Sequence, residues 1–465
     1  MKKIIGLILV VLLVALSGCY TIFEQFTTTG STNTGSTNTG STNTNTNTNQ
    51  DSTNRQTNNI DVYSFRTDTP DPLINRIPQN IENLRNSNPE EYIRQIAAFI
   101  KSNSVNDFDM IKKAHDFVAV TTRYDADSFL ANRIPNQSYQ NVLRTRLAVC
   151  EGYAALFKKL CDELGVTCIV VHGYARGVGS SATVTDRPSQ TNHAWNMITV
   201  NGQNYLIDCT WDSGYLDGRV FSQRYTTDYL FLKPEHFIYS HFPTNAQHQL
   251  LARPLSADQF IALPPLKPKF FDVAENLSIN LQRINRVNDR FSFEYTVKDQ
   301  YYFSFRVTDV RTGREVQNRS FVQRNGSRHT AHFSFPSSGQ YNITVFWWGP
   351  GSERGWGCGD FIVEASSGNR LEFPLIYSSS AVNLSIISPI ESPLERGRTY
   401  TFRVRVDNKN NVALYHGSTF IQFTKGSDGI FSLEYRIPNN ASELFLGVAD
   451  SERSQYESII RYQVQ

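Results

Sequence analysis

The sequence predicts an α+β domain followed by two all-β sandwiches of immunoglobulin-like size. The first half shows apolar residues at helical spacing and one strong hairpin signal, whereas from about Leu266 the chain changes to short alternating strands without helical period. The tetrapeptide Asn-Leu-Ser-Ile at 276–279 recurs at 383–386, each time before such a run of strands. The predicted domains are 61–265 for the α+β domain, 266–367 for the first sandwich and 368–465 for the second.

The chain begins like an exported protein. Two lysines precede the apolar run from Ile4 to Leu16, which is too short to span a bilayer, so residues 1–18 are predicted to be a signal peptide. Its end, Leu-Ser-Gly-Cys, resembles a bacterial lipobox, and this resemblance implies that Cys19 carries lipid. The expected location is therefore the bacterial cell envelope, lipid-anchored to a membrane and facing the periplasm or the cell exterior.

Residues 19–60 are predicted to be a lipidated cysteine and a disordered tether. From Thr27 onward the segment is mostly Ser, Thr, Asn and Gly with "GSTNT" in tandem, so it has almost nothing apolar to bury. The formal net charge of the whole chain is +2, and no cluster of Lys and Arg is interleaved with aromatic residues. A nucleic-acid partner is therefore not expected.

Several helices are predicted before residue 166. One spans Asp107–Thr121, and residues 124–140, rich in Asn, Pro and Ser, are predicted to form a loop after it. The stretch "AVCEGYAALFKKLCDELGV", residues 148–166, predicts an amphipathic helix that ends at Gly165. Its apolar side consists of Tyr153, Leu156, Phe157, Leu160, Cys161 and Leu164.

A hairpin is predicted between "HAWNMITV" and "QNYLIDCTW". These two strand-like runs are separated by Asn-Gly at 201–202, the strongest short hairpin signal. A two-residue turn pairs Val200 with Gln203, and this register places His193 and Asp208 on the same face, diagonal to each other across the strands. An imidazole and a carboxylate at that spacing can form a hydrogen bond.

Cys150 stands at the first turn of the predicted amphipathic helix. Unpaired backbone N–H groups and the positive end of the helix dipole favour a thiolate there, and the same N–H groups can hold an oxyanion. With His193 as the base and Asp208 orienting it, Cys150 can act as a nucleophile. The alternatives are a buried structural thiol and one half of a disulfide.

The cysteine count bears on these alternatives. The chain has six cysteines, so lipid on Cys19 leaves an odd number and at least one unpaired thiol, for which Cys150 is the best candidate. Cys161 and Cys168 lie on buried faces of consecutive elements. They are predicted to be packed thiols, with a bridge in an oxidising compartment as the alternative.

Three blocks of this sequence resemble the signature blocks of the transglutaminase-like superfamily: "AVCEGYAALFKKLCDELGV", "NHAWNMI" and "YLIDCTWD". The resemblance implies a papain-like α+β fold over residues 71 to about 265, with Cys150 as nucleophile, His193 as base and Asp208 as orienting acid. Residues 228–251, "DYLFLKPEHFIYSHFPTNAQHQLL", resemble the kyphoscoliosis peptidase and hillarin group, in which β-sandwich domains often follow.

Four residues near the predicted triad have two interpretations. Trp195 and Trp211 flank it and either form walls of the substrate cleft or fill the core beneath the hairpin. Tyr153 and Asn196 have the same two interpretations.

No metal or organic cofactor is expected. His236, His241 and His248 cluster in sequence, but their spacing matches no standard zinc pattern and no cysteine joins them, so they are predicted to have packing and surface roles.

The chemistry that a Cys-His-Asp triad supports is acyl transfer through a thioester. Water as the acceptor makes the enzyme a peptidase or amidase, and an amine makes it a cross-linking enzyme. We expect hydrolysis of protein or peptide amides, because the resemblance favours it. The alternative is a catalytically idle transglutaminase-like scaffold or adhesion lipoprotein whose sandwiches bind an envelope or host protein.

Overall fold

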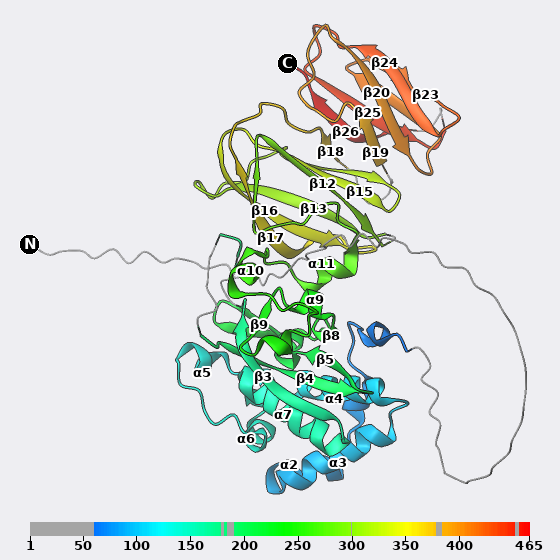
Figure 1. The fold of residues 1–465 in the computed structure, drawn as a ribbon. Helices are drawn as coiled ribbons and strands as arrows, with labels where there is room; N and C mark the ends of the chain where they lie inside the picture. Colours follow the sequence, from blue (N-terminus) through cyan, green and yellow to red (C-terminus); the bar gives the residue numbers. More distant parts are fainter. Residues whose placement is uncertain (1–59, 178–180, 184–189, 299, 378–383, 452–454) are drawn as a thin grey trace, which may run out of the picture.

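A computed structural model describes residues 60–177, 181–183, 190–298, 300–377, 384–451 and 455–465. The predicted signal peptide, Cys19 and the tether up to residue 59 lie outside the described residues. The described chain forms an α+β domain and then two β-sandwiches that follow one another away from it (Figure 1). Among the described residues, no helix is both long enough and apolar enough to cross a bilayer.

The α+β domain is mainly helical up to Leu164, and after that residue strands alternate with short helices. Its helices are η1 (Val62–Phe65), η2 (Pro72–Arg76), α1 (Gln79–Glu82), α2 (Leu84–Ser87), α3 (Pro89–Ser102), α4 (Asp107–Thr121), α5 (Ala126–Leu130), α6 (Tyr139–Thr145), α7 (Cys150–Leu164), α8 (Cys209–Ser213), α9 (Pro234–Phe237), η3 (Ala246–Gln249) and α10 (Ala257–Ala262). Its strands are β1 (Arg123–Tyr124), β2 (Leu147–Ala148), β3 (Thr167–Ala175), β4 (His193–Val200), β5 (Gln203–Ile207), β6 (Gly214–Asp217), β7 (Val220–Gln223), β8 (Leu230–Leu232) and β9 (His241–Pro243).

A five-stranded antiparallel sheet of order β8-β5-β4-β3-β9 carries the hairpin. Val200 pairs with Gln203, so the predicted register is confirmed as far as the pair Asn196–Ile207. β5 ends there, and the expectation that the strand continues through Asp208 is wrong, because Asp208 begins α8 instead.

Helix α7 packs against β3 and β4 (Figure 1). All six residues of its predicted apolar side are buried, and Gly165 ends the helix with a φ of 79°, as the sequence predicts. The helix predicted over Asp107–Thr121 is also confirmed as α4. The prediction of a continuous loop over 124–140 is wrong, since Asp125 accepts a hydrogen bond from the Ser128 N–H (3.1 Å) and caps α5.

Each sandwich consists of two antiparallel or mixed sheets packed on a shared core, as predicted. After α11 (Pro268–Val273), the first has the sheets β10 (Ala274–Glu275), β12 (Arg290–Val297), β15 (Arg328–Ser334), β14 (Ser320–Asn325) and β11 (Ile284–Val287), β17 (Trp356–Ala365), β16 (Gly339–Trp348), β13 (Tyr302–Asp309). The second has β18 (Leu375–Ile376), β26 (Glu457–Gln463), β25 (Glu443–Ala449), β21 (Asn411–His416), β22 (Thr419–Gln422) and β19 (Leu384–Ser388), β20 (Thr399–Val406), β24 (Ile430–Arg436), β23 (Thr424–Lys425).

The repeated tetrapeptide does not take one structure in its two places. Residues 384–386 belong to strand β19, whereas 276–279 lie between β10 and β11 outside any strand. The strands of the sandwiches follow from alternation of apolar and polar residues, as in β12, and not from this repeat.

The α+β domain and the first sandwich share a hydrophobic cluster. Tyr239 and Leu263 of the α+β domain pack in the same buried cluster as Phe270 and core residues of the sandwich. A polar contact joins the two parts as well. The Ala182 N–H donates to both carboxylate oxygens of Asp360 (3.3 and 3.2 Å), and its carbonyl accepts from Arg283 (2.9 Å).

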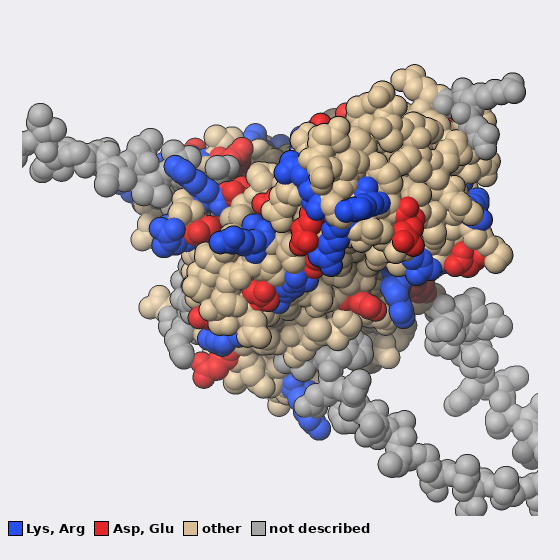
Figure 2. Space-filling view, turned by 90° about the horizontal axis from the view of Figure 1, so that it is seen from above, with Lys and Arg blue, Asp and Glu red and all other residues tan. Residues whose placement is uncertain are grey.

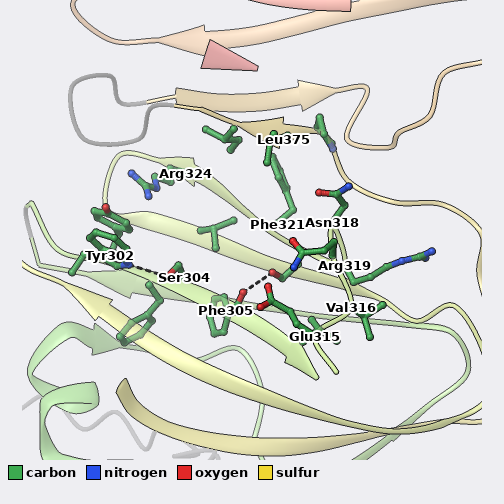
Figure 3. Close-up of a pocket in the computed structure, with 18 of the residues that line it drawn as sticks. Tyr302, Ser304, Phe305, Glu315, Val316, Asn318, Arg319, Phe321, Arg324 and Leu375 are labelled. Carbon is green, nitrogen blue, oxygen red and sulfur yellow. Dashed lines mark hydrogen bonds between the residues drawn. The ribbon is translucent and has the colours of Figure 1, made fainter. Parts of the chain in front are cut away.

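Charges of both signs are interspersed on the face of the molecule seen in Figure 2. Some of the ion pairs connect the two sandwiches, such as that between Arg290 and Glu391 (2.7 Å). A cavity of about 350 Å³ lies between the edge strands β13 and β14 of the first sandwich and β18 of the second (Figure 3). Phe305 and Phe321 line it together with Leu375, and no lining residue belongs to the α+β domain.

Shortening Leu266, a fully buried residue of the shared cluster, tests whether this cluster stabilises the fold. We expect Leu266→Ala to lower the free energy of unfolding by about 2–5 kcal/mol, because the substitution leaves a cavity that its neighbours cannot fill. Urea unfolding monitored by fluorescence measures this. The matched control Leu130→Ala, at a position that is 37% exposed, should cost less than about 1 kcal/mol. Equal costs for the two variants would contradict the shared cluster.

Candidate active site

Cys150 is the first residue of α7 and is partly exposed. Its sulfur contacts the imidazole of His193 and the backbone N–H of Ala194, both at the start of β4. Burial acts to raise the pKa of the Cys150 thiol, but the charge of His193 and these hydrogen bonds outweigh it and lower the pKa below its ordinary value. The two strand residues thus favour the thiolate.

His193 lies between Cys150 and Asp208. Its Nε2 contacts the Asp208 Oδ2 at 2.7 Å, which leaves Nδ1 as the nitrogen that faces the Cys150 sulfur. Burial acts to lower the pKa of His193, but Asp208 and the Cys150 thiolate raise it to about 10. At neutral pH the arrangement therefore favours an imidazolium between two anions.

Asp208 is 1% exposed and has a second function in the fold. Its Oδ1 accepts from the N–H groups of Thr210 (2.8 Å) and Trp211 (3.2 Å), so it is the N-cap of α8. Burial acts to raise the pKa of the carboxyl, but His193 and His241 lower it well below its usual range. The contact with His193 was predicted from strand pairing, whereas in the structure Asp208 makes it from the N-cap of α8, with Oδ1 on the backbone and Oδ2 facing the imidazole.

His241 is a member of this site that sequence reasoning missed. Its Nε2 contacts the Asp208 Oδ2 at 3.1 Å, whereas the sequence predicted only a packing or surface role. β9 brings it there by pairing Ala175 of β3 with His241. This pairing joins strands β3 and β9, which are far apart in the sequence, so no local spacing could reveal the contact of His241 with Asp208.

Three of the four predicted cleft residues are buried supports. Trp195 is 1% exposed and lies against His193 with ring centroids 6.0 Å apart. Tyr153 donates to the Thr122 carbonyl (2.8 Å), and Asn196 donates to the Ala154 carbonyl (3.1 Å). Their burial fits the interpretation that they fill the core beneath the hairpin.

Trp211 and Tyr124 are the partly exposed aromatic residues beside the triad. The Trp211 ring lies 5.3 Å from that of His193. Burial raises the pKa of Tyr124 of β1 above its ordinary value, and the charge of the nearby Cys150 raises it further. Tyr124 was not predicted as a site residue. Strand pairing brings it to the site, because Tyr124 of β1 pairs with Ala148 of β2, two residues before Cys150.

The first turn of α7 is packed closely from one side. The Gln137 Oε1 accepts the Val149 N–H at 2.9 Å. A Cβ on Gly152 would lie 2.5 Å from that same oxygen and 2.8 Å from the Ala148 Cβ, so a larger residue would force this packing to shift. The glycine at position 152 thus lets Gln137, which precedes α6, approach closely and hold Val149, the residue before Cys150.

The remaining cysteines of the described chain are free and buried. Cys161 and Cys168 are both free, buried thiols that lie near each other, which fits the predicted packed pair. Burial raises the pKa of both Cys161 and Cys209 well above the ordinary value, so these thiols differ from Cys150 in their tendency to ionise.

Within the described residues, one group of side chains has a composition that can bind a metal ion: His193, Asp208 and His241. Both imidazoles contact the same carboxylate oxygen at hydrogen-bond distances, 2.7 and 3.1 Å. These contacts compensate the buried charge within the protein. The absence of a metal requirement stays a prediction.

A buried charged network holds α8 at its other end. The fully buried His115 of α4 contacts Asp116 (3.2 Å) and Asp212 of α8 (3.0 Å). Lys112 and Tyr225 donate to Asp116. Burial acts to lower the pKa of His115, but the two carboxylates raise it to about 9. The helix that Asp208 caps is therefore fixed to α4 through ionic hydrogen bonds.

Comparisons with known proteins find similarity over the part of the chain that contains this site. Residues 94–209 match the sequence profile of the transglutaminase-like superfamily. The chain is 26% identical over 259 residues to the kyphoscoliosis peptidase of Mus musculus, covering 55% of this chain and 38% of that protein. It is 33% identical over 164 residues to the kyphoscoliosis peptidase of Homo sapiens, covering 33% and 25%, and 32% identical over 133 residues to hillarin of Drosophila melanogaster, covering 26% and 16%.

The α+β domain is therefore a transglutaminase-like domain. Within that superfamily the similarity to kyphoscoliosis peptidase and hillarin supports the narrower resemblance that the sequence blocks predicted. The matched part spans less than two fifths of the length of each of these relatives.

Replacing His115 tests the network below α8. Because its pKa in the folded protein is raised from 6.5 to about 9, the proton on His115 stabilises the fold fully below pH 6.5, and this stability is lost as the pH rises through 9. We expect His115→Gln to be less stable than wild type by a few kcal/mol at pH 6, with the difference shrinking by pH 10. Urea unfolding at both pH values measures it.

The control for this experiment is His172→Gln, which changes an imidazole whose side chain is 49% exposed. The free energy of unfolding of His172→Gln should change with pH in the same way as that of wild type. A difference between wild type and His115→Gln that stays constant from pH 6 to pH 10 would contradict a protonated His115.

Proposed function

We propose that this chain is a cysteine enzyme that transfers acyl groups from protein or peptide amides through a thioester, most often to water, as a peptidase-like hydrolase. The observation that carries the proposal is the hydrogen-bonded series from Cys150 through His193 to Asp208. The transglutaminase-like domain supports it, as do relatives that are named peptidases.

In the first half of the proposed reaction, the Cys150 thiolate attacks the carbonyl carbon of the amide. The carbonyl oxygen becomes an oxyanion next to the N-terminus of α7, where backbone N–H groups lack intrahelical acceptors. His193 then gives its Nδ1 proton to the departing amine as the C–N bond breaks, and a thioester remains on Cys150. Asp208 holds the imidazole ring in the orientation that both steps need.

In the second half, His193 takes a proton from water, which attacks the thioester carbonyl. The carboxylic acid leaves, and Cys150 is again a thiolate beside a protonated His193. An amine that enters in place of water yields a new amide by the same steps. Trp211 near His193 and Tyr124 near Cys150 are partly exposed, and we expect them to touch the acyl group.

The location is part of the proposal. The lipobox-like sequence at Cys19 supports a lipid-anchored protein of the bacterial cell envelope that faces the periplasm or the cell exterior. The two sandwiches extend from the α+β domain and offer surfaces for an envelope or host protein (Figure 1).

Alkylation of the full chain with iodoacetamide at a series of pH values tests the proposed nucleophile. We expect Cys150 to react faster than the other thiols and to remain reactive well below pH 9.0, its ordinary pKa, because His193 stabilises the thiolate. His193→Ala should shift the reactivity of Cys150 to higher pH. Mass spectrometry identifies the modified cysteines, and labelling of Cys161 serves as the buried reference.

The matched control is His172→Ala, which removes an exposed imidazole that pairs with Glu151 (2.9 Å), the neighbour of Cys150. It should leave the pH dependence of Cys150 close to that of wild type. A Cys150 that reacts no faster than Cys161, whether or not His193 is present, would instead favour an idle scaffold that binds partners through its sandwiches.

A further inference from the structure

One carboxylate oxygen of Asp208 serves two imidazoles. The Oδ2 contacts the Nε2 atoms of His193 at 2.7 Å and of His241 at 3.1 Å, while the Oδ1 accepts two backbone N–H groups. An ionised carboxylate can only accept hydrogen bonds, so all four partners must donate. The second imidazole is therefore a donor to the same atom that orients the proposed catalytic base.

The neighbours of His241 determine its protonation. Burial lowers the pKa of His241 to about 4, so the imidazole is neutral near pH 7 and carries one N–H. Since Asp208 requires a donor, that hydrogen is on Nε2, and Nδ1 accepts from the Ser240 hydroxyl at 2.8 Å. Ser240 also lies 3.4 Å from the Phe237 carbonyl, a longer contact.

The fold fixes the His241 ring in place. His241 is fully buried, and its ring contacts Phe237 at a centroid distance of 4.2 Å and Trp211 at 4.5 Å. Gly173 of β3 lets β9 approach, because a Cβ there would lie 2.3 Å from the Phe242 carbonyl oxygen and 2.6 Å from the Trp195 ring. The sheet edge is thus built so that this imidazole reaches Asp208.

We propose that His241 is a positioning residue for the proposed acyl transfer, which holds the Asp208 carboxylate in the orientation that binds His193. The inference rests on the proposed function and adds a fourth residue to the triad. In the proposed role, His241 affects Cys150 only through Asp208 and His193.

The charge of each group explains why a neutral imidazole suits this position. A second imidazolium would repel the one on His193, whereas a neutral N–H stabilises the carboxylate without competing for its charge. If that donor is removed, the N–H groups of Thr210 and Trp211 still hold Oδ1, but Oδ2 keeps His193 as its one partner and can tilt away from it. The imidazolium is then less stabilised, and so is the Cys150 thiolate that depends on it.

The test compares the rate of Cys150 alkylation by iodoacetamide across pH in the full chain with two substitutions. His241→Phe keeps an aromatic ring and removes the N–H, and His241→Gln supplies an amide N–H. We expect His241→Phe to lower the alkylation rate at pH 7 about tenfold and to shift its acid limb to higher pH. His241→Gln should restore most of the rate and the wild-type limb.

A double-substitution cycle shows whether His241 acts through Asp208. In an Asp208→Asn background, adding His241→Phe should change the rate less than about twofold, because the carboxylate that it positions is gone. A further tenfold loss in that background would overturn the proposal. Near-UV circular dichroism checks folding, and His241→Met, which also lacks an N–H, replaces the Phe variant with the same expected loss if that variant does not fold.

The wild-type and His193→Ala profiles, measured in parallel, separate two kinds of failure. A wild-type Cys150 with an ordinary thiol profile that ignores His193 overturns the proposed function and this inference together. Suppose instead that the acid limb of the Cys150 alkylation profile lies at low pH and depends on His193, but does not change in His241→Phe. This result overturns the positioning role alone.

Discussion

A carboxylate buried from water persists only where donated hydrogen bonds replace its hydration, and Asp208 obtains four of them. Two come from the backbone of α8 and two from imidazoles on β4 and β9. The same charge therefore ends β5, begins a helix and joins strands from both sides of β3. The orientation of His193, and through it the ionisation of Cys150, depends on this compensation.

Buried charged groups hold α8 on one side of the site, and the N-terminus of α7 forms the other side. α8 has a buried carboxylate at each end, Asp208 at its cap and Asp212 against His115 of α4. α7 presents Cys150 at its first turn, where Gly152 permits close packing by Gln137. A short helix fixed at both ends and a long helix fixed by packing leave little freedom for the groups between them.

Local patterns predicted the parts of this arrangement that depend on periodicity. The apolar side of α7 and the register of the β4–β5 hairpin follow directly from spacing and from the Asn-Gly turn. Spacing could not distinguish a strand from a cap at Asp208, because an aspartate can end a strand by accepting the N–H groups that follow it. It also could not place His241, whose position depends on long-range pairing of β9 with β3.

The sequence also could not predict which of the aromatic residues near the triad are buried. Trp195 and Trp211 both flank the triad, yet one lies in the core and the other is partly exposed, since β4 is a central strand and α8 lies at the end of the neighbouring strand. Position along the chain does not fix which face of a sheet is covered. Tertiary packing of α7 and β9 decides it here.

The contact of Ala182 with Asp360 and Arg283 determines which fragment of the chain can serve as an independent unit. A fragment that stops near residue 265 would leave Leu263 exposed, lose Phe270, and lose both partners of a residue that lies between β3 and β4. The shortest fragment that keeps all of these contacts therefore extends through the first sandwich.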